Sequence, residues 1–156
     1  MTLKHLFKAV INWSSRQNEE QTERKFYSKS HKVSIEGKPV LKVSAAKAFK
    51  GDPDLYNPED LLLSSLVSCH MMSYLYVCSQ SGIEVLEYTD NAEATLEVFP
   101  DGSGRFIEVR LYPKVTIANH DKIQKALDLH TKANQLCFIA NSCNFAVLHN
   151  ATCKTA

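Results

Sequence analysis

The stretch that decides the fold is NPEDLLLSSLVSCHMMSYLYVCSQSGIEV, residues 57–85. It has the start and stop signals of one long helix. Asn57 suits the N-cap, Pro58 suits the first helical position, and Gly82 suits the position just after the end. Two acidic residues follow Pro58, where they face the positive end of the helix dipole. We therefore predict a helix that begins at Pro58 and ends shortly before Gly82.

No charged residue occurs from 61 to 83, so this helix is apolar on nearly every side. The run is long enough for a membrane span. However, it contains serines and a histidine, and its charged flanks, Asp60 and Glu84, are both acidic. We therefore predict that protein covers it on nearly every side and that no membrane is involved. One sheet cannot supply all of that cover, so we expect a homodimer.

Outside this helix, the sequence predicts strands and one more helix. Strands are expected over residues 7–13, in two runs within 25–45 joined at 36–38, over 85–99 and 105–117 joined by PDGSG, and over 144–154. Residues 119–142 are expected to form an amphipathic helix that Asn119 caps, with an apolar stripe of Ile123, Ala126, Leu127, Leu129 and Leu136. The predicted fold class is α+β, in the order β-β-β-α-β-β-α-β, with two helices on antiparallel sheets in a single domain, residues 1–156.

Composition narrows the function classes. The 18 basic and 17 acidic side chains give a net charge of +1, which supplies no attraction for nucleic acid. Lys4 and Lys8 interrupt the first residues, so we predict no secretory signal. Five cysteines in a chain without such a signal favour the reducing cytoplasm. We expect a cytoplasmic protein with neither nucleic acid nor membrane as partner.

Cys69 lies in the middle of the uncharged helix, and several readings of it are open. A free cysteine among apolar residues is often a small core side chain. Metal binding is disfavoured because the closely spaced cysteine pairs of structural zinc sites are missing. Cys69 and His70, as neighbours on a helix, also point about 100° apart. We expect neither a metal nor an organic cofactor.

Thiol redox chemistry needs a thiolate, hence a cation near the sulfur, and often a second cysteine. Cys78 is nine residues, or about 13 Å, further along the helix than Cys69, which is beyond disulfide reach. Cys137 and Cys143 lie near the end of the other predicted helix and could come close. Spacing in the sequence does not choose between them.

Three segments resemble the OsmC/Ohr family of thiol peroxidases. NPEDLLLSSLVSCH, residues 57–70, is similar to the family's active-site helix, with Asn-Pro-Glu and a cysteine ten places after the glutamate. LCFIANSCNF, residues 136–145, resembles the segment of the second cysteine in one subgroup. YTDNAEATLEV, residues 88–98, fits the same subgroup. The resemblance extends from Trp13 to Val147.

The resemblance implies an intertwined homodimer with two active sites at the subunit interface. It implies an enzyme that reduces organic hydroperoxides, an antioxidant activity of the oxidative stress response. Cys69 would be the peroxidatic cysteine and Cys137 the resolving cysteine, whose disulfide an external dithiol reduces. Glu59 matches the family's glutamate, which holds an arginine against the thiolate.

The position of that arginine is where this sequence departs from the pattern. Subgroup members tend to read Tyr-Ser-Arg before a histidine, whereas this chain has Lys29 before His31. Lysine lacks the bidentate fork of arginine, so we assign the role to Arg24 and keep Lys29 as its rival. His31 and His70 either orient neighbouring groups or are structural. Glu59 is about 15 Å from Cys69 along a straight helix, so another side chain must link them.

Two other classes of function are weighed against the peroxidase. A redox-sensing or ligand-binding protein with the same fold would have little turnover, and Lys29 is the best support for that reading. A metal-binding protein would contain stoichiometric zinc after purification. Turnover of an organic hydroperoxide with a dithiol reductant separates the peroxidase from both.

Overall fold

The computed structural model describes residues 3–15 and 27–156. Its contacts divide the chain into two compact units, Met1–Leu61 and Leu62–Ala156, here called the N-terminal and C-terminal units. Each is described by itself. The division does not test the prediction of one domain, because two compact units can belong to one domain.

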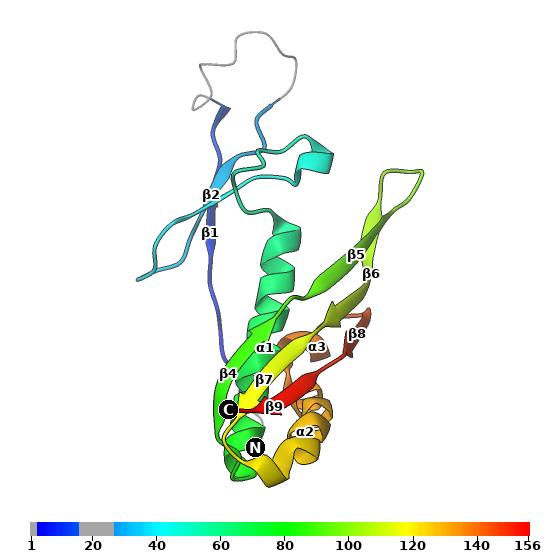
Figure 1. The fold of residues 1–156 in the computed structure, drawn as a ribbon. Helices are drawn as coiled ribbons and strands as arrows, with labels where there is room; N and C mark the ends of the chain where they lie inside the picture. Colours follow the sequence, from blue (N-terminus) through cyan, green and yellow to red (C-terminus); the bar gives the residue numbers. More distant parts are fainter. Residues whose placement is uncertain (1–2, 16–26) are drawn as a thin grey trace. The chain divides into compact units, whose positions relative to one another are not determined.

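The N-terminal unit contains a three-stranded antiparallel sheet in the order β1-β2-β3 (Figure 1). The strands are β1 (Val10–Asn12), β2 (His31–Ser34) and β3 (Leu41–Val43), and a short 3-10 helix, η2 (Lys47–Phe49), follows. Gly37 turns the chain between β2 and β3 with a φ of 75°, a left-handed conformation that glycine adopts without strain. The hairpin predicted at 36–38 is confirmed, whereas β1 is shorter than its predicted run.

Helix α1 (Pro58–Gln80) has the predicted bounds. The Asn57 side chain accepts a hydrogen bond of 2.8 Å from the Asp60 amide, and the Asp60 carboxylate accepts one of 3.3 Å from the Asn57 amide. This reciprocal cap satisfies amides that the helix leaves without partners. Gly82, at a φ of 64°, follows the helix end.

In the C-terminal unit, each long predicted strand is two strands. The first run is β4 (Val85–Asp90) and β5 (Glu93–Val98), and the second is β6 (Gly104–Leu111) and β7 (Pro113–Ile117). The break has a physical cause in Asp90, whose carboxylate accepts a 2.7 Å hydrogen bond from the Tyr112 amide. That amide therefore leaves the strand ladder just where Pro113, which has no N–H, comes next.

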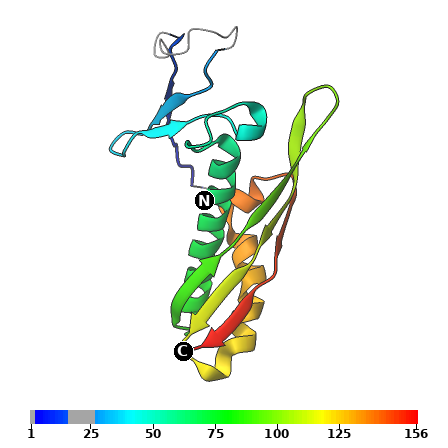
Figure 2. The ribbon, with the colours of Figure 1, turned by 45° about the horizontal axis from the view of Figure 1, so that its top comes forward.

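The last predicted strand is also two, β8 (Ala146–His149) and β9 (Thr152–Thr155). They complete the sheets β5-β6-β8 and β4-β7-β9, and each joins its neighbour in parallel. The prediction of antiparallel sheets is therefore wrong for these two pairs. In Figures 1 and 2, β4–β9 form one curved layer, and α1 and α2 lie on one of its faces.

The second predicted helix is divided as well. It consists of η3 (His120–Lys122), α2 (Ile123–Leu136) and the short α3 (Phe138–Asn141). Asn119 occupies the N-cap position of η3 as expected, but its side chain does not cap the helix, because its oxygen accepts a 2.9 Å hydrogen bond from the Glu84 amide. The α+β fold class is nevertheless confirmed, with Cys137 at the junction of α2 and α3.

Among the described residues of the C-terminal unit, one side of α1 is covered. Its buried residues form one stripe: Leu66, His70, Tyr74, Val77 and Cys78. Met72 and Tyr76 are 60% and 59% exposed. By length and composition, α1 is also apolar enough to cross a membrane, with a window of mean hydropathy 1.5, a criterion that core helices of soluble proteins also meet. The described residues of the C-terminal unit therefore do not supply the predicted cover on nearly every side.

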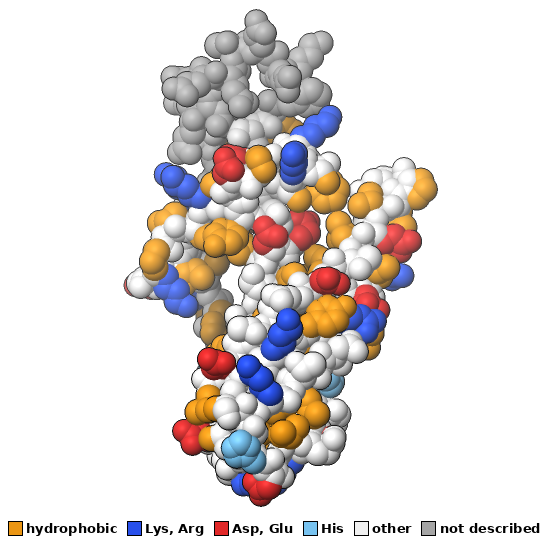
Figure 3. Space-filling view, viewed as in Figure 1, with side chains coloured by type: hydrophobic (Ala, Val, Ile, Leu, Met, Phe, Trp, Pro, Cys, Tyr) orange, Lys and Arg blue, Asp and Glu red, His pale blue; other side chains and the backbone are white. Residues whose placement is uncertain are grey.

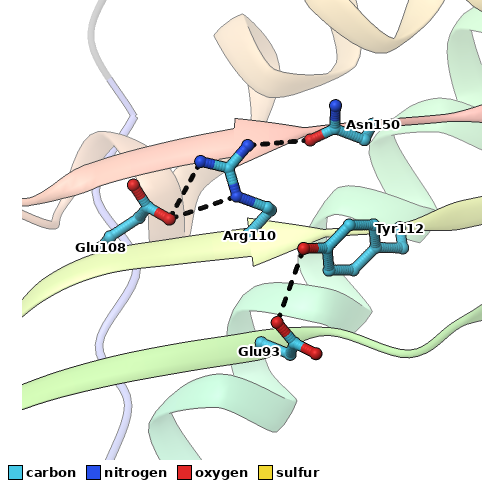
Figure 4. Close-up of polar contacts among 5 residues, drawn as sticks. All are labelled: Glu93, Glu108, Arg110, Tyr112 and Asn150. Carbon is cyan, nitrogen blue, oxygen red and sulfur yellow. Dashed lines mark hydrogen bonds and ion pairs between the residues drawn. The ribbon is translucent and has the colours of Figure 1, made fainter.

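The opposite face of the strand layer is polar. Acidic and basic side chains are interspersed over it in Figure 3. Arg110 donates to Glu108 through Nε and Nη2, at 3.2 and 3.0 Å, and to Asn150 through Nη1, at 3.0 Å (Figure 4). Beside it, the Tyr112 hydroxyl donates to Glu93 at 3.5 Å. Arg110 is thus held by surface partners.

Candidate functional site

Cys69 and Cys137 meet between helices α1 and α2. Cys69 is half-buried on α1, Cys137 is fully buried, and both are free thiols. The Cys69 side chain lies close enough to Cys137 to contribute to the raised pKa of the Cys137 thiol. Burial chiefly, together with hydrogen bonding to Cys69, raises the pKa of Cys137 to about 11. Of the pair, Cys137 is therefore a neutral thiol at physiological pH.

The local backbone explains why Cys137 can reach Cys69. Its φ of −71° and ψ of 109° are extended, so α2 ends there and α3 begins. The Cys137 sulfur accepts a 3.4 Å hydrogen bond from the Ala140 amide and thus caps α3. That amide opposes the rise in the pKa of Cys137, but burial is the larger effect. The helix junction therefore fixes the Cys137 side chain and directs it into the interior of the protein.

An apolar cavity of about 360 Å³ opens beside the thiol pair. Its lining consists of Cys69, Met72, Ser73, Tyr76, Leu136 and Phe138. Phe138 is 81% exposed at its edge, and Cys69 is the lining residue with reactive chemistry. The cavity therefore gives an apolar molecule a route to the Cys69 sulfur.

The other cysteines point elsewhere. Cys143 packs on the cluster of Leu66, Val109 and Leu111, and its thiol donates to the Ile139 carbonyl at 3.2 Å. Cys78 lies in the second core cluster, against which Cys153 packs. Burial raises the pKa of all three thiols. Cys78 is fully buried, and Cys69 affects the pKa of Cys137 but not that of Cys143, so the geometry favours Cys137 over Cys143 as the partner of Cys69.

His70 faces away from the cavity and into the interface of α1 and α2. Its Nε2 is 3.0 Å from Nδ1 of His130, and the ring of His149 lies 5.9 Å from its own. Tyr74 stacks on His130 at 3.9 Å. Burial lowers the pKa of His70 to about 4 and that of His130 to about 3, with the neighbouring histidines as the second cause.

His130 is the residue that sequence reasoning missed. The predicted apolar stripe of the second helix ran through Ile123, Ala126, Leu127, Leu129 and Leu136. Helical spacing from Ala126 puts His130 on that same face, four residues on. A polar residue in register with an apolar stripe was the available signal. No group of three potential metal ligands occurs among the residues that the structure describes.

The candidate site residues of the N-terminal unit have separate surroundings. The Lys29 ammonium donates to the Phe49 carbonyl at 2.6 Å, and His31 Nδ1 lies 2.9 Å from the Lys29 carbonyl. Glu59, in the first turn of α1, has a buried Oε2 with no hydrogen-bond partner among the residues described. Arg24, the predicted partner of Glu59, lies outside the described residues, as does Arg16. The roles given to these residues stay predictions.

Comparisons with known proteins agree with the fold. A family model described as OsmC-like protein matches residues 51–150. An OsmC-like protein of unknown function from Vibrio cholerae is 27% identical over 95% of this chain and 99% of its own, with a TM-score of 0.82. No curated protein matches the chain.

Two further solved structures are similar in fold. An organic hydroperoxide resistance protein from Elizabethkingia anophelis is 20% identical over 100% of both chains, with a TM-score of 0.72. An organic hydroperoxide resistance protein from Legionella pneumophila is 18% identical over 97% of this chain and 99% of its own, with a TM-score of 0.68.

Proposed function

The chain belongs to the OsmC-like family, and from that premise we propose that it is a cysteine-based peroxidase that reduces organic hydroperoxides to alcohols. One observation carries the proposal: Cys69 and a protonated Cys137 interact beside an apolar cavity that Cys69 itself lines. The solved structures of similar fold include proteins named for organic hydroperoxide resistance.

The proposed cycle begins when the Cys69 thiolate attacks the distal oxygen of the hydroperoxide. The O–O bond breaks, the alkoxide takes a proton and leaves as the alcohol, and Cys69 becomes a sulfenic acid. The Cys137 thiol then forms a disulfide with Cys69. The sulfenic hydroxyl leaves as water with the proton of Cys137. An external dithiol reduces the disulfide and restores both thiols by exchange.

The cavity lining supports an organic substrate. Met72, Tyr76, Leu136 and Phe138 offer apolar surface to an alkyl or aryl group, and hydrogen peroxide would gain nothing from it. We therefore propose hydroperoxides with a bulky apolar group as the substrate class. No organic cofactor or metal is needed for the cycle.

We propose that Arg24, oriented by Glu59, supplies the cation that keeps Cys69 ionised. A buried carboxylate oxygen without a partner is costly, and a guanidinium is the group that would satisfy it. Lys29 is less suited because its ammonium is engaged by the Phe49 carbonyl. Lys29 remains the rival donor, because it stands where the subgroup has arginine.

A homodimer in the cytoplasm completes the proposal. Met72, Leu75 and Tyr76 leave an apolar side of α1 open to solvent in the single chain. A second copy covers such a surface without a membrane, and it covers the cavity of the thiol pair at the same time.

The competing proposal is a redox sensor or ligand-binding protein with little turnover. The observation that favours it is Lys29, which stands where the subgroup has arginine and binds a backbone carbonyl instead. The thiols of such a protein would be oxidised once, and the resulting disulfide would then react slowly with dithiols.

Thiol mapping tests the proposal. The reduced protein receives one equivalent of cumene hydroperoxide, and its cysteines are identified by mass spectrometry. We expect a Cys69–Cys137 linkage within seconds and repeated consumption of hydroperoxide when dithiothreitol is added. Cys143→Ser, a matched control, should behave as wild type. A linkage without repeated turnover would support the sensor, and an unmodified Cys69 would contradict both.

A further inference from the structure

The hydrogen-bonded histidines between α1 and α2 have no role in the proposed cycle. His70 and His130 are 1% and 0% exposed, and Nε2 of His70 lies 3.0 Å from Nδ1 of His130. Their rings are nearly parallel, at an interplanar angle of 8°. A hydrogen bond between two buried imidazoles from two helices requires the desolvation of both rings, which costs free energy of folding.

The cost follows from the outer nitrogens. His70 Nδ1 and His130 Nε2 are buried and have no partner among the described residues. Either tautomer of the pair leaves one N–H and one lone pair unsatisfied, at about 1–3 kcal/mol for each group. Two apolar side chains would pack the same space without that loss. Packing alone therefore does not account for the pair.

The position of the pair relative to the thiols suggests its role. Three contacts join the helices in succession: Cys69 with Cys137, His70 with His130, and Tyr74 with the Ala126 carbonyl at 3.0 Å. Residue numbers rise on α1 as they fall on α2, so the helices are antiparallel. The histidine bond is the contact next to the thiols, and it is a directional one.

We propose that the His70–His130 hydrogen bond is a positioning contact that fixes α2 against α1, so that the Cys137 sulfur stays in place to close the disulfide with Cys69. This inference rests on the thiol cycle proposed above. The closing step joins the two sulfurs at about 2.05 Å and releases water. It requires both helices in register, whereas attack on the peroxide requires Cys69 and its cation only.

A slip of one residue along a helix moves a side chain by about 1.5 Å. Misplacement of about 1 Å can slow a reaction between held groups about 100-fold. Loss of the histidine bond should therefore slow disulfide closure and leave sulfenic acid formation unchanged. A purely structural role would lower stability without separating these two steps.

Acid should affect closure through the same bond. The titratable groups facing the pair are Tyr74 on α1, His149 on β8 and, behind Tyr74, Tyr88 on β4. No carboxylate contributes to the lowered pKa values of His70 and His130. A proton on either ring makes both of its nitrogens donors and adds a cation with no counter-charge at hand.

Stopped reactions with 2,2′-dithiodipyridine test the inference. Cys69 attacks the reagent to form a mixed disulfide and release one thiopyridone, and Cys137 then displaces the second. Acid quenching and mass spectrometry follow the Cys69–Cys137 linkage in the full chain. His130→Leu breaks the bond. His70→Gln with His130→Asn replaces the two rings by side-chain amides of the same reach, so that the NH2 group of one can donate to the carbonyl oxygen of the other. His149→Leu removes the adjacent ring and leaves the bond.

We expect closure to slow roughly 10-fold or more in His130→Leu, to recover to within about threefold in the double amide variant, and to stay within about twofold of wild type in His149→Leu. Formation of the mixed disulfide should be equal in all four proteins. Between pH 6 and pH 4, closure should slow in wild type more than in the double amide variant.

Equal closure rates in wild type and His130→Leu would overturn the inference, as would equal pH profiles for wild type and the double amide variant. If the His130→Leu variant does not fold, the comparison of pH profiles tests the inference in its place. The reagent forms the disulfide without peroxide, so this test does not depend on peroxidase activity. A protein that closes its disulfide with dithiodipyridine but does not reduce hydroperoxides would contradict the proposed function. The closure rates of its variants would still test the positioning contact.

Discussion

Two pairs of cysteines, at two positions along helix α1, show how strongly the surroundings of a cysteine determine its reactivity. Cys69 lines a cavity and meets Cys137, whose backbone is at a helix junction. Cys78, nine residues on, is enclosed in the core cluster on which Cys153 packs. The residue type and the helix are the same. Access and the backbone of the partner differ, and we attribute reactivity to these two features.

The largest expected effect is that of Cys69→Ser. The substitution removes the sulfur that attacks the peroxide, so consumption of cumene hydroperoxide with dithiothreitol should fall to the background rate. A ferrous–xylenol orange assay measures the remaining peroxide. Cys78→Ser is the matched control and should keep activity within about twofold, because a buried neutral thiol does not react. Loss of activity in Cys78→Ser with an unchanged melting temperature would contradict the comparison.

Cys137→Ser should separate the two steps. The first equivalent of hydroperoxide should be consumed at the wild-type rate, and Cys69 should then remain a sulfenic acid that dimedone traps. Steady-state turnover should fall roughly 100-fold, because Cys69 is not among the groups that affect the thiols of Cys78, Cys143 and Cys153. Normal turnover in this variant would mean that Cys143 or an external thiol resolves the sulfenic acid.

Acid should weaken the fold through the histidine pair that lies between the two cysteine levels. The pKa of His70 is about 4 and that of His130 about 3 in the folded state, against 6.5 when unfolded. The unfolded chain therefore binds protons first, and stability falls as the pH drops below about 6.5. From pH 7.5 to pH 5.5, the loss should be about 1.4 kcal/mol for each histidine.

Urea unfolding at the two pH values measures this loss. The variant His70→Leu with His130→Leu should show a much smaller change between them. An equal change in wild type and variant would mean that other groups cause the acid sensitivity.

The smallest effect expected is on the ionisation of Cys69. Alkylation of Cys69 by iodoacetamide at pH 7 should slow about 10-fold in Arg24→Ala and less in Glu59→Gln, because a cation favours the thiolate. Lys29→Ala should change it little, since Lys29 binds the Phe49 carbonyl. Cys78 should remain unlabelled throughout. Slower alkylation in Lys29→Ala alone would move the role to the lysine.

The sequence predicted well those features that local chemistry determines. The bounds of α1 follow from Asn57, Pro58 and Gly82, whose preferences depend on their own backbone positions. Family membership followed from motifs that include both thiols. Asn119 is the N-cap residue of η3 as predicted, but its side chain makes no capping hydrogen bond because the Glu84 amide, 35 residues away, donates to it instead. A competitor distant in sequence leaves no local signal.

The same limit applies to the strands and to the site. The long strands break because Asp90 binds the Tyr112 amide, a contact across 22 residues. The parallel pairing of β8 and β9 depends on where the chain returns after α2. The bond of His70 to His130 spans 60 residues. The choice of Cys137 over Cys143 as the partner of Cys69 needed the break between α2 and α3, which two adjacent segments of similar helical pattern do not reveal.

That break also determines what a closed disulfide would do to its surroundings. The Cys137 sulfur accepts the Ala140 amide hydrogen, and Phe138 at the start of α3 borders the cavity. Bonding to Cys69 draws this sulfur away from the first turn of a helix of only four residues, which has little cooperativity of its own. Oxidation would therefore loosen the rim of the cavity while leaving α2 intact. In the proposed cycle, the oxidised protein would then present a wider entrance to the external dithiol than the reduced protein presents to the hydroperoxide.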